Sequence, residues 1–199
     1  MKVRRIVPQR CLGAIIDVQE FFLSHAVGHP RSRLKANTGN LARLLDYFRI
    51  PVVVTLERPV DQKGALPSEI ERLLGKLAQV FEKDFFDLTR EKTIRDHLAR
   101  LKKTQAIVAG CETDVCVLQS CLGLLELGYE VYVVEDLLFS SARNVEPALV
   151  RMRAEGAVLP TYKSLYYELI AAVEGGRHAT KMLAALGPFP DDLPDCAIS

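Results

Sequence analysis

The amino-acid sequence predicts a three-layer α/β/α fold in which helices cover both faces of a mostly parallel, six-stranded sheet. Short apolar runs alternate with amphipathic segments along the chain, so strands and helices are expected to alternate as well. The apolar runs contain few polar residues, which is typical of strands buried on both faces. Right-handed crossovers between such strands give a Rossmann-like arrangement.

The elements follow from these patterns in chain order. The expected strands are residues 12–16, 51–55, 80–81, 105–109, 130–134 and 157–159. Between them, apolar residues recur at helical spacing, and Gly128 and Gly156 are suited to end helices. The expected helices are residues 40–48, 68–77, 93–101, 118–127, 146–155 and 164–173.

Composition indicates one soluble domain. The 199 residues are 49% hydrophobic and 26% charged, and the net charge of +1 gives no electrostatic footprint for nucleic acid or membrane. The basic start of the chain does not resemble a signal peptide. An odd number of cysteines without such a signal favours reduced thiols and a cytoplasmic location. These cysteines are Cys11, Cys111, Cys116, Cys121 and Cys196.

We expect residues 1–175 to form a single domain. Residues 176–199 read as a C-terminal tail that begins near a glycine pair and ends in a proline-containing segment. Two interpretations stay open for this tail, namely a flexible end and an arm that packs on a neighbouring subunit.

Three polar residues are expected at one edge of the sheet. Asp17 ends the first strand, Lys83 follows the third, and Cys116 follows the fourth at a strand-to-helix turn. In open parallel sheets the ligand site lies beyond the carboxyl ends of the strands. The unpaired N–H groups and positive dipole of a helix start favour a thiolate. Each residue type is often merely structural, but together an acid, a base and a thiol indicate nucleophilic chemistry.

Several motifs match one known family over about residues 10–172. They are Asp17-x-Gln19, Lys83 followed by Phe85-Phe86, Gly110-x-x-Thr113-x-x-Cys116-Val117, Gly128-Tyr129-x-Val131, Val133-Val134-x-Asp136 and Met152-x-x-x-Gly156-Ala157. With this set, the chain resembles the isochorismatase-like cysteine hydrolase superfamily, which includes nicotinamidases and N-carbamoyl amide hydrolases.

The resemblance implies a catalytic triad of Asp17, Lys83 and Cys116. It also implies a cis peptide bond between Cys111 and Glu112, with the backbone N–H groups of Glu112 and Cys116 forming an oxyanion hole.

The resemblance further places Phe22 and Gln19 at the substrate pocket. For Phe22, a core-facing aromatic on the first helix is an equally good interpretation.

One departure from the family bears on metals. Nicotinamidases carry an Asp-x-His metal segment after the second strand, whereas residues 55–59 of this chain contain no histidine. We therefore expect no metal and no cofactor, and nicotinamide is a poor candidate substrate.

The sequence thus predicts a cysteine-dependent hydrolase of a small amide or carbamoyl-type C–N bond, acting through a thioester acyl-enzyme. Asp17 is expected to take the Cys116 proton and return it to the leaving group, while Lys83 balances their charges. Three alternatives stay open: an isochorismatase-type enol ether hydrolase, an oligomeric small-molecule-binding protein with little turnover, and a redox-sensing thiol paired with Cys111 or Cys121. The expected partners are a small-molecule substrate and further copies of the chain in a homo-oligomer.

Overall fold

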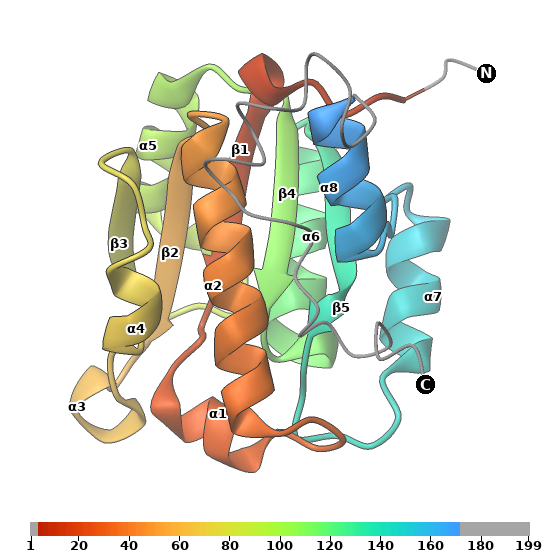
Figure 1. Cartoon of the computed structure of the whole chain (residues 1–199). Helices are drawn as coiled ribbons and strands as arrows, with labels where there is room; N and C mark the ends of the chain where they lie inside the picture. Colours follow the sequence, from red (N-terminus) through yellow and green to blue (C-terminus); the bar gives the residue numbers. More distant parts are fainter. Residues whose placement is uncertain (1–3, 172–199) are drawn as a thin grey trace, which may run out of the picture.

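The computed structural model describes residues 4–171, which form a parallel sheet of five strands in the order β3-β2-β1-β4-β5 (Figure 1). Every pair of neighbouring strands is parallel. The strands are β1 (Cys11–Ile16), β2 (Val52–Glu57), β3 (Ala78–Lys83), β4 (Gln105–Gly110) and β5 (Glu130–Leu138).

Helices cover both faces of the sheet, which confirms the predicted three-layer architecture (Figure 1). The core on one face involves α1 (Glu20–His25), α2 (Arg31–Tyr47), α4 (Ser68–Glu71) and α8 (Tyr162–Ile170). The core on the other face involves α5 (Lys92–Leu101), α6 (Leu118–Glu126) and α7 (Glu146–Ala154). Short connecting pieces are α3 (Val60–Lys63), 3₁₀ turns at Pro8–Arg10 and Leu88–Arg90, and a π-helical turn at Thr113–Val117.

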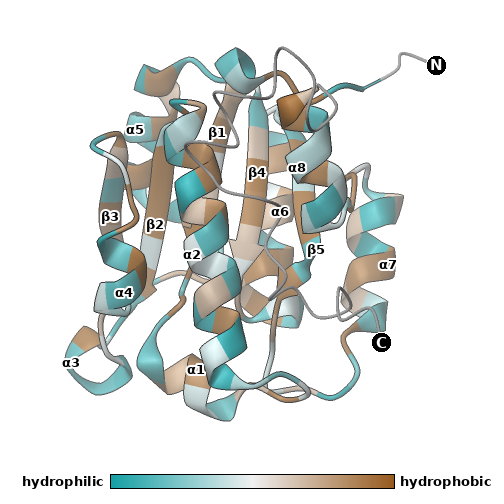
Figure 2. Cartoon of the chain, in the orientation of Figure 1, coloured by the Kyte–Doolittle hydropathy of each residue, from teal (hydrophilic) through white to brown (hydrophobic). Residues whose placement is uncertain are grey.

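The central strands are buried on both faces, as their apolar runs predict. All six residues of β1 and all six of β4 are buried, and both strands are hydrophobic along most of their length in Figure 2. Within β1, Ile15 belongs to the core under α2 and Ile16 to the core under α6. This alternation directs successive side chains into opposite layers.

The predicted count of six strands is wrong. The expected strand at residues 157–159 makes only one isolated parallel bridge, between Val158 and Tyr132 of β5. Pro160 follows, and its carbonyl accepts the N–H of Glu135 at 3.0 Å. Because proline has no N–H to donate, the ladder does not continue.

Other boundaries differ from the sequence-based expectation in ways that matter for the site. The β3 strand lies at the edge of the sheet and has six residues rather than the predicted two. Because an edge strand is only partly buried, with Val80 43% exposed, its sequence is less apolar than that of a central strand. Lys83 is therefore the last residue of this strand. The α2 helix begins at Arg31, nine residues before its predicted start, whereas the helix expected at 68–77 is reduced to α4.

Residues 172–199 lie outside the described residues, and they contain the predicted tail at 176–199 and the end of the helix expected at 164–173. The domain boundary at residue 175 stays a prediction. Among residues 4–171, every helix is too short or too polar to cross a bilayer.

Candidate active site

The carboxyl ends of four neighbouring strands bring a cysteine, a lysine and two carboxylates together. Asp17 follows β1, Glu57 ends β2, Lys83 ends β3, and Cys116 lies in the turn after β4. The chain moves outward from β1 to β3 and then crosses to β4 on the opposite side of β1. This reversal of strand order is the position where α/β sheets open a crevice for ligands.

The backbone between β1 and β4 is closely packed at this edge. Gly110 has φ 121°, and a Cβ there would lie 2.1 Å from the carbonyl oxygen of Ile16, so only glycine fits. The next N–H, that of Cys111, donates to the same carbonyl at 2.9 Å. Asp17 has the left-handed φ of 50°, which is uncommon for a residue with a side chain. The predicted cis peptide bond between Cys111 and Glu112 is confirmed.

Asp17 and Lys83 form a fully buried ion pair. Lys83 Nζ lies 2.7 Å from Asp17 Oδ2, and both side chains are 0% exposed. The hydroxyl of Thr55 donates to Asp17 Oδ1 at 2.7 Å, so each carboxylate oxygen has a polar neighbour. Burial raises the pKa of Asp17 more than the Lys83 charge lowers it. Burial also lowers the pKa of Lys83, but the charges around its ammonium, led by Asp17, raise it above its ordinary value.

Cys116 is buried, 1% exposed, with its sulfur between a cation and a carboxylate. Lys83 Nζ lies 3.6 Å from the sulfur, and the thiol donates to Glu57 Oε2 at 3.1 Å. Burial and the negative charge of Asp17 raise the pKa of Cys116, against the lowering effect of Lys83. The raised pKa and the hydrogen bond to Glu57 favour the thiol, whereas the helix start alone favours a thiolate.

Glu57 is a component of this site that the sequence analysis missed. Its Oε1 pairs with Lys63 Nζ, and its Oε2 lies 3.7 Å from Lys83 Nζ as well as beside the sulfur. Burial raises the pKa of Glu57, but hydrogen bonds from Lys63 and Cys116 and the two lysine charges hold it below its ordinary value. The rule used to choose Asp17 and Lys83 also identifies Glu57, because it is the first charged residue after the second apolar run.

Gln19 holds the loop that carries Glu57. Its amide nitrogen donates to the carbonyls of Glu57 and Gly64 at 3.2 and 2.7 Å, and its amide oxygen accepts the Glu57 N–H at 2.7 Å. Phe22 is 8% exposed within the core, and Lys63 Nζ lies 5.7 Å from its ring centroid. Substrate contacts by Gln19 and Phe22 stay predictions.

The turn that carries Cys116 is fixed to the end of β5. Thr113 donates to the Phe139 carbonyl through its N–H at 3.1 Å and its hydroxyl at 3.0 Å. The Glu112 carboxylate accepts from the N–H of Ser141 at 3.2 Å and from its hydroxyl. This side chain thus anchors the turn, and the oxyanion hole expected at the Glu112 and Cys116 N–H groups stays a prediction.

In the described part of the chain, one group of acidic and thiol side chains has its potential metal-ligand atoms close enough together to bind one metal ion. The donor atoms of Asp17, Glu57 and Cys116 lie within 4.8 Å of one another. The Lys83 ammonium is 2.7, 3.7 and 3.6 Å from these three groups respectively, so a positive charge already lies among them. This arrangement opposes a second cation by repulsion.

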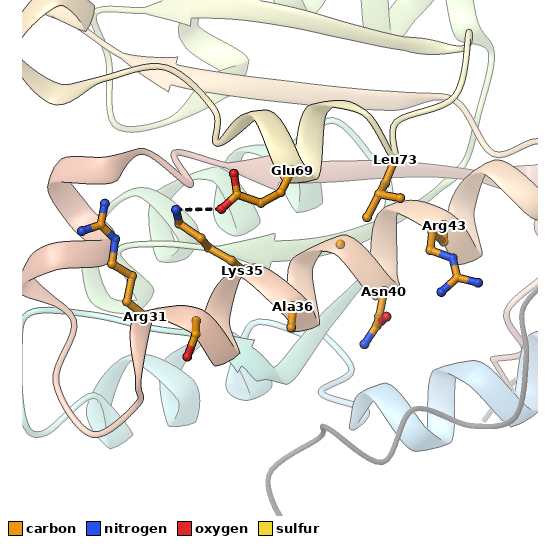
Figure 3. A pocket seen from close by; sticks show the side chains of 9 residues that line it. Arg31, Lys35, Ala36, Asn40, Arg43, Glu69 and Leu73 are labelled. Carbon is orange, nitrogen blue, oxygen red and sulfur yellow. Dashed lines mark ion pairs between the residues drawn. The ribbon is translucent and has the colours of Figure 1, made fainter.

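A separate pocket of about 660 Å³ lies between α2 and α4 (Figure 3). Lys35 pairs there with Glu69 at 2.8 Å (Figure 3). Lys35 also pairs at 2.7 Å with Glu20, which does not line the pocket. None of the predicted site residues lines this pocket.

The model of the isochorismatase domain family matches residues 14–163 of this sequence. The chain belongs to the isochorismatase family. The secreted isochorismatase effector Isc1 of Phytophthora sojae is 32% identical over 190 residues, covering 93% of this chain and 88% of the relative. A cytoplasmic location accordingly stays a prediction.

Two solved structures share the fold over almost their whole length. The MAR1 ribonuclease of Caenorhabditis elegans superimposes with a TM-score of 0.83 at 25% identity, covering 98% of this chain and 97% of that one. The Escherichia coli YcaC gene product, described as an octameric hydrolase of unknown specificity, has a TM-score of 0.84 at 22% identity, covering 94% and 93%. Family membership makes this chain a hydrolase of the isochorismatase superfamily.

Proposed function

We propose that this isochorismatase-family chain hydrolyses a small amide or carbamoyl-type C–N bond through a thioester formed on Cys116. The observation that carries the proposal is the position of the Cys116 sulfur, 3.6 Å from the Lys83 ammonium and 3.1 Å from a carboxylate oxygen. A thiol beside a proton acceptor and a cation is the arrangement of an activated nucleophile.

The proposed hydrolysis has an acylation stage and a hydrolysis stage. A carboxylate takes the thiol proton, the thiolate attacks the carbonyl carbon, and the C=O electron pair moves onto oxygen. The backbone N–H groups of Glu112 and Cys116 are the proposed donors to this oxyanion. Its collapse breaks the C–N bond, the leaving nitrogen takes a proton, and water then hydrolyses the thioester. The resemblance assigns the proton transfers to Asp17, which Lys83 keeps in place at 2.7 Å.

The proposed substrate is a neutral small molecule, and the mechanism needs no cofactor. Within the site, the two lysines Lys63 and Lys83 balance the carboxylates of Asp17 and Glu57. The chain's net charge of +1 offers no general attraction for a polyanion such as RNA. We therefore do not propose for this chain the ribonuclease activity that the nematode protein's name gives.

We also propose a homo-oligomer. Phe85 and Phe86, just beyond Lys83, are each 49% exposed, which is unusual for adjacent aromatic residues. The octameric assembly of the E. coli hydrolase with the same fold is consistent with this surface being covered by further copies.

The test exposes the wild type and a Cys116→Ala variant to a panel of small amides, ureas and carbamoyl compounds. Intact-protein mass spectrometry detects the adduct, and ammonia release is followed in parallel. An adduct or ammonia release in the wild type alone supports the proposal. Turnover that survives in Cys116→Ser favours the enol ether alternative. Silence across the panel, with a thiol inert to alkylation, favours the binding protein.

A further inference from the structure

We infer that Thr55 is a positioning residue, whose hydroxyl fixes Asp17 so that the Cys116 proton is received on Oδ2 of the carboxylate. This inference rests on the proposed function, because it concerns the transfer of the thiol proton to Asp17. The motifs that carry the family resemblance do not include Thr55, and the folded chain brings its hydroxyl to the Asp17 carboxylate.

The β2 strand places Thr55 beside the end of β1. In the strand register Thr55 pairs with Ile16, the residue before Asp17. Its neighbours Val54 and Leu56 belong to the core under α2, so the Thr55 side chain points into the opposite layer. Thr55 is 0% exposed, and a hydroxyl buried to this degree needs an acceptor. The Asp17 carboxylate is that acceptor.

Thr55 holds Asp17 at two points. The Asp17 N–H donates to the Thr55 carbonyl at 3.0 Å, and the Thr55 hydroxyl donates to Asp17 Oδ1 at 2.7 Å. The Asp17 carbonyl in turn accepts the Gln19 N–H at 2.8 Å and the Cys111 thiol at 3.0 Å. The backbone is thus fixed on both sides, and the Thr55 hydroxyl fixes the carboxylate before any substrate arrives.

The two oxygens of the Asp17 carboxylate have different surroundings. Oδ1 accepts the Thr55 hydroxyl, and a proton placed on Oδ1 would remove that hydrogen bond in a buried position. Oδ2 lies 2.7 Å from Lys83 Nζ, and among the described residues it has no hydrogen-bond partner of regular geometry. Burial raises the pKa of this carboxyl group, whereas Lys83 and the hydrogen bonds of Thr55 and Cys116 lower it. Oδ2 is therefore the oxygen that can receive the thiol proton.

The transfer balances in charge and in atoms. The S–H bond of Cys116 breaks, an O–H bond forms on Asp17 Oδ2, and the negative charge moves to the sulfur, 3.6 Å from Lys83 Nζ. The Thr55 hydroxyl continues to donate to Oδ1 throughout. When the C–N bond breaks, the proton on Oδ2 passes to the leaving nitrogen and Asp17 is ionised again.

Four charged or titratable side chains face Asp17. They are Lys83 from β3, Glu57 from β2, and Cys111 and Cys116 after β4. Burial raises the pKa of Glu57, but its hydrogen bonds and the neighbouring lysines hold it below its ordinary value. Glu57 therefore keeps its charge and does not compete with Asp17 for the thiol proton.

The first test needs no substrate. The protein is labelled with ¹³C at its aspartate carboxyl carbons, and the Asp17 signal is identified by its absence from Asp17→Asn. Thr55→Val keeps the side-chain shape but removes the donor, so the apparent titration midpoint of Asp17 should rise by about one unit or more. Thr55→Ser keeps the donor and should titrate close to the wild type. An unchanged midpoint in Thr55→Val would overturn the inference.

The second test uses the substrate that the panel identifies. In Thr55→Val, kcat near neutral pH should fall about tenfold or more, because the carboxylate loses its fixed orientation and is ionised in fewer molecules. The acid limb of the pH profile should move to higher pH. KM should change little, since the Thr55 side chain is fully buried, and Thr55→Ser should recover the rate. Thr55→Ala gives the same comparison if the added valine methyl does not fit.

The matched control is Thr89→Val. The Thr89 hydroxyl also donates to an aspartate, Asp87 Oδ1, at 2.8 Å, but this pair is not among the groups that face Asp17. The control loses the same kind of hydrogen bond and should keep the wild-type kcat and Asp17 midpoint. A loss of kcat in Thr89→Val equal to that in Thr55→Val would show a general effect on the fold and would overturn the inference.

Failure of the inference is distinguishable from failure of the proposed function. If Cys116→Ala retains turnover, the proposed function fails. If Cys116→Ala is inactive while Thr55→Val has the wild-type kcat and acid limb, only the role of Thr55 fails. A raised midpoint with wild-type kcat likewise overturns the inference, because the hydroxyl then has no effect on the transfer.

Discussion

Lys83 and Asp17 meet at 2.7 Å with both side chains fully buried, although β3 and β1, which bring them there, are separated in the sheet by β2. This ion pair therefore spans three strands, and its two charges depend on one another. Replacing Lys83 leaves Asp17 as an uncompensated buried charge.

Lys83→Met should destabilise the fold by about 3–5 kcal/mol near neutral pH, because it leaves Asp17 unpaired. Burial already raises the pKa of Asp17, and losing Lys83 raises it further. The folded state then binds a proton that the unfolded state releases above about pH 4, so the penalty should grow as pH rises and shrink in acid.

Urea unfolding at acidic and neutral pH checks this. The control is Lys92→Met, which breaks an exposed pair with Asp96 and should change little at either pH. A penalty for Lys83→Met that is equal at both pH values would contradict the buried-pair explanation.

Cys116→Ala should abolish turnover while leaving the fold nearly intact. The substitution removes one buried sulfur atom that contributes to the core, and the cost should be about 1 kcal/mol. Thermal unfolding and ammonia release, measured on the same preparation, separate the two effects. Activity at the original rate would rule out the thioester mechanism.

Lys63→Met should raise the pKa of Glu57, because the Lys63 hydrogen bond and charge help to hold that pKa below its ordinary value. A lowered pKa contributes stability above the unfolded-state pKa of about 4.3, and this contribution is lost as pH falls through the folded-state pKa. The wild type should therefore exceed Lys63→Met in stability near neutral pH, with the gap closing in acid.

If the ionised Glu57 carboxylate, 3.1 Å from the Cys116 sulfur, is required for activity, the same variant should shift the acid limb of the pH–activity profile to higher pH. Lys63→Arg keeps the charge and should leave the profile near that of the wild type. Identical profiles for the methionine and arginine variants would show that the Lys63 charge does not influence the reaction.

Gly110→Ala should destabilise the chain by about 3 kcal/mol, because a Cβ would lie 2.1 Å from the Ile16 carbonyl oxygen and φ is 121°. Gly128→Ala is the matched comparison. Its φ of 85° is also left-handed, but nothing lies within 4 Å of the added carbon, so about 1–2 kcal/mol is expected. Chemical denaturation of both variants measures the difference, and equal losses would mean that the close approach is unimportant.

The sequence was sufficient to predict the layers and the positions of most strands, because apolar runs such as that in β1 are buried on both sides. The sequence-based prediction of strands failed for segments that are only partly buried. The edge strand β3 is mixed in character, and the segment around Val158 is apolar enough for a strand but is followed by a proline.

For the site, the sequence identified Asp17, Lys83 and Cys116, which the fold brings together, but it missed Glu57. The strand-end rule applies to β2 as well, and there it leads to Glu57. The distance from Glu57 to the sulfur depends on the Gln19 contacts and the Lys63 pair, and no sequence spacing determines these.

The three hydrogen bonds of Gln19 have a consequence for redesign of this enzyme. This side chain, two residues after Asp17, connects the loop after β1 to the loop after β2 at Glu57 and Gly64. A new loop grafted at residues 57–64 to change substrate preference would lose its attachment unless it presents the same backbone groups to Gln19. Directed evolution of specificity should therefore vary Gln19 together with that loop, since the two carboxylates cannot be repositioned independently.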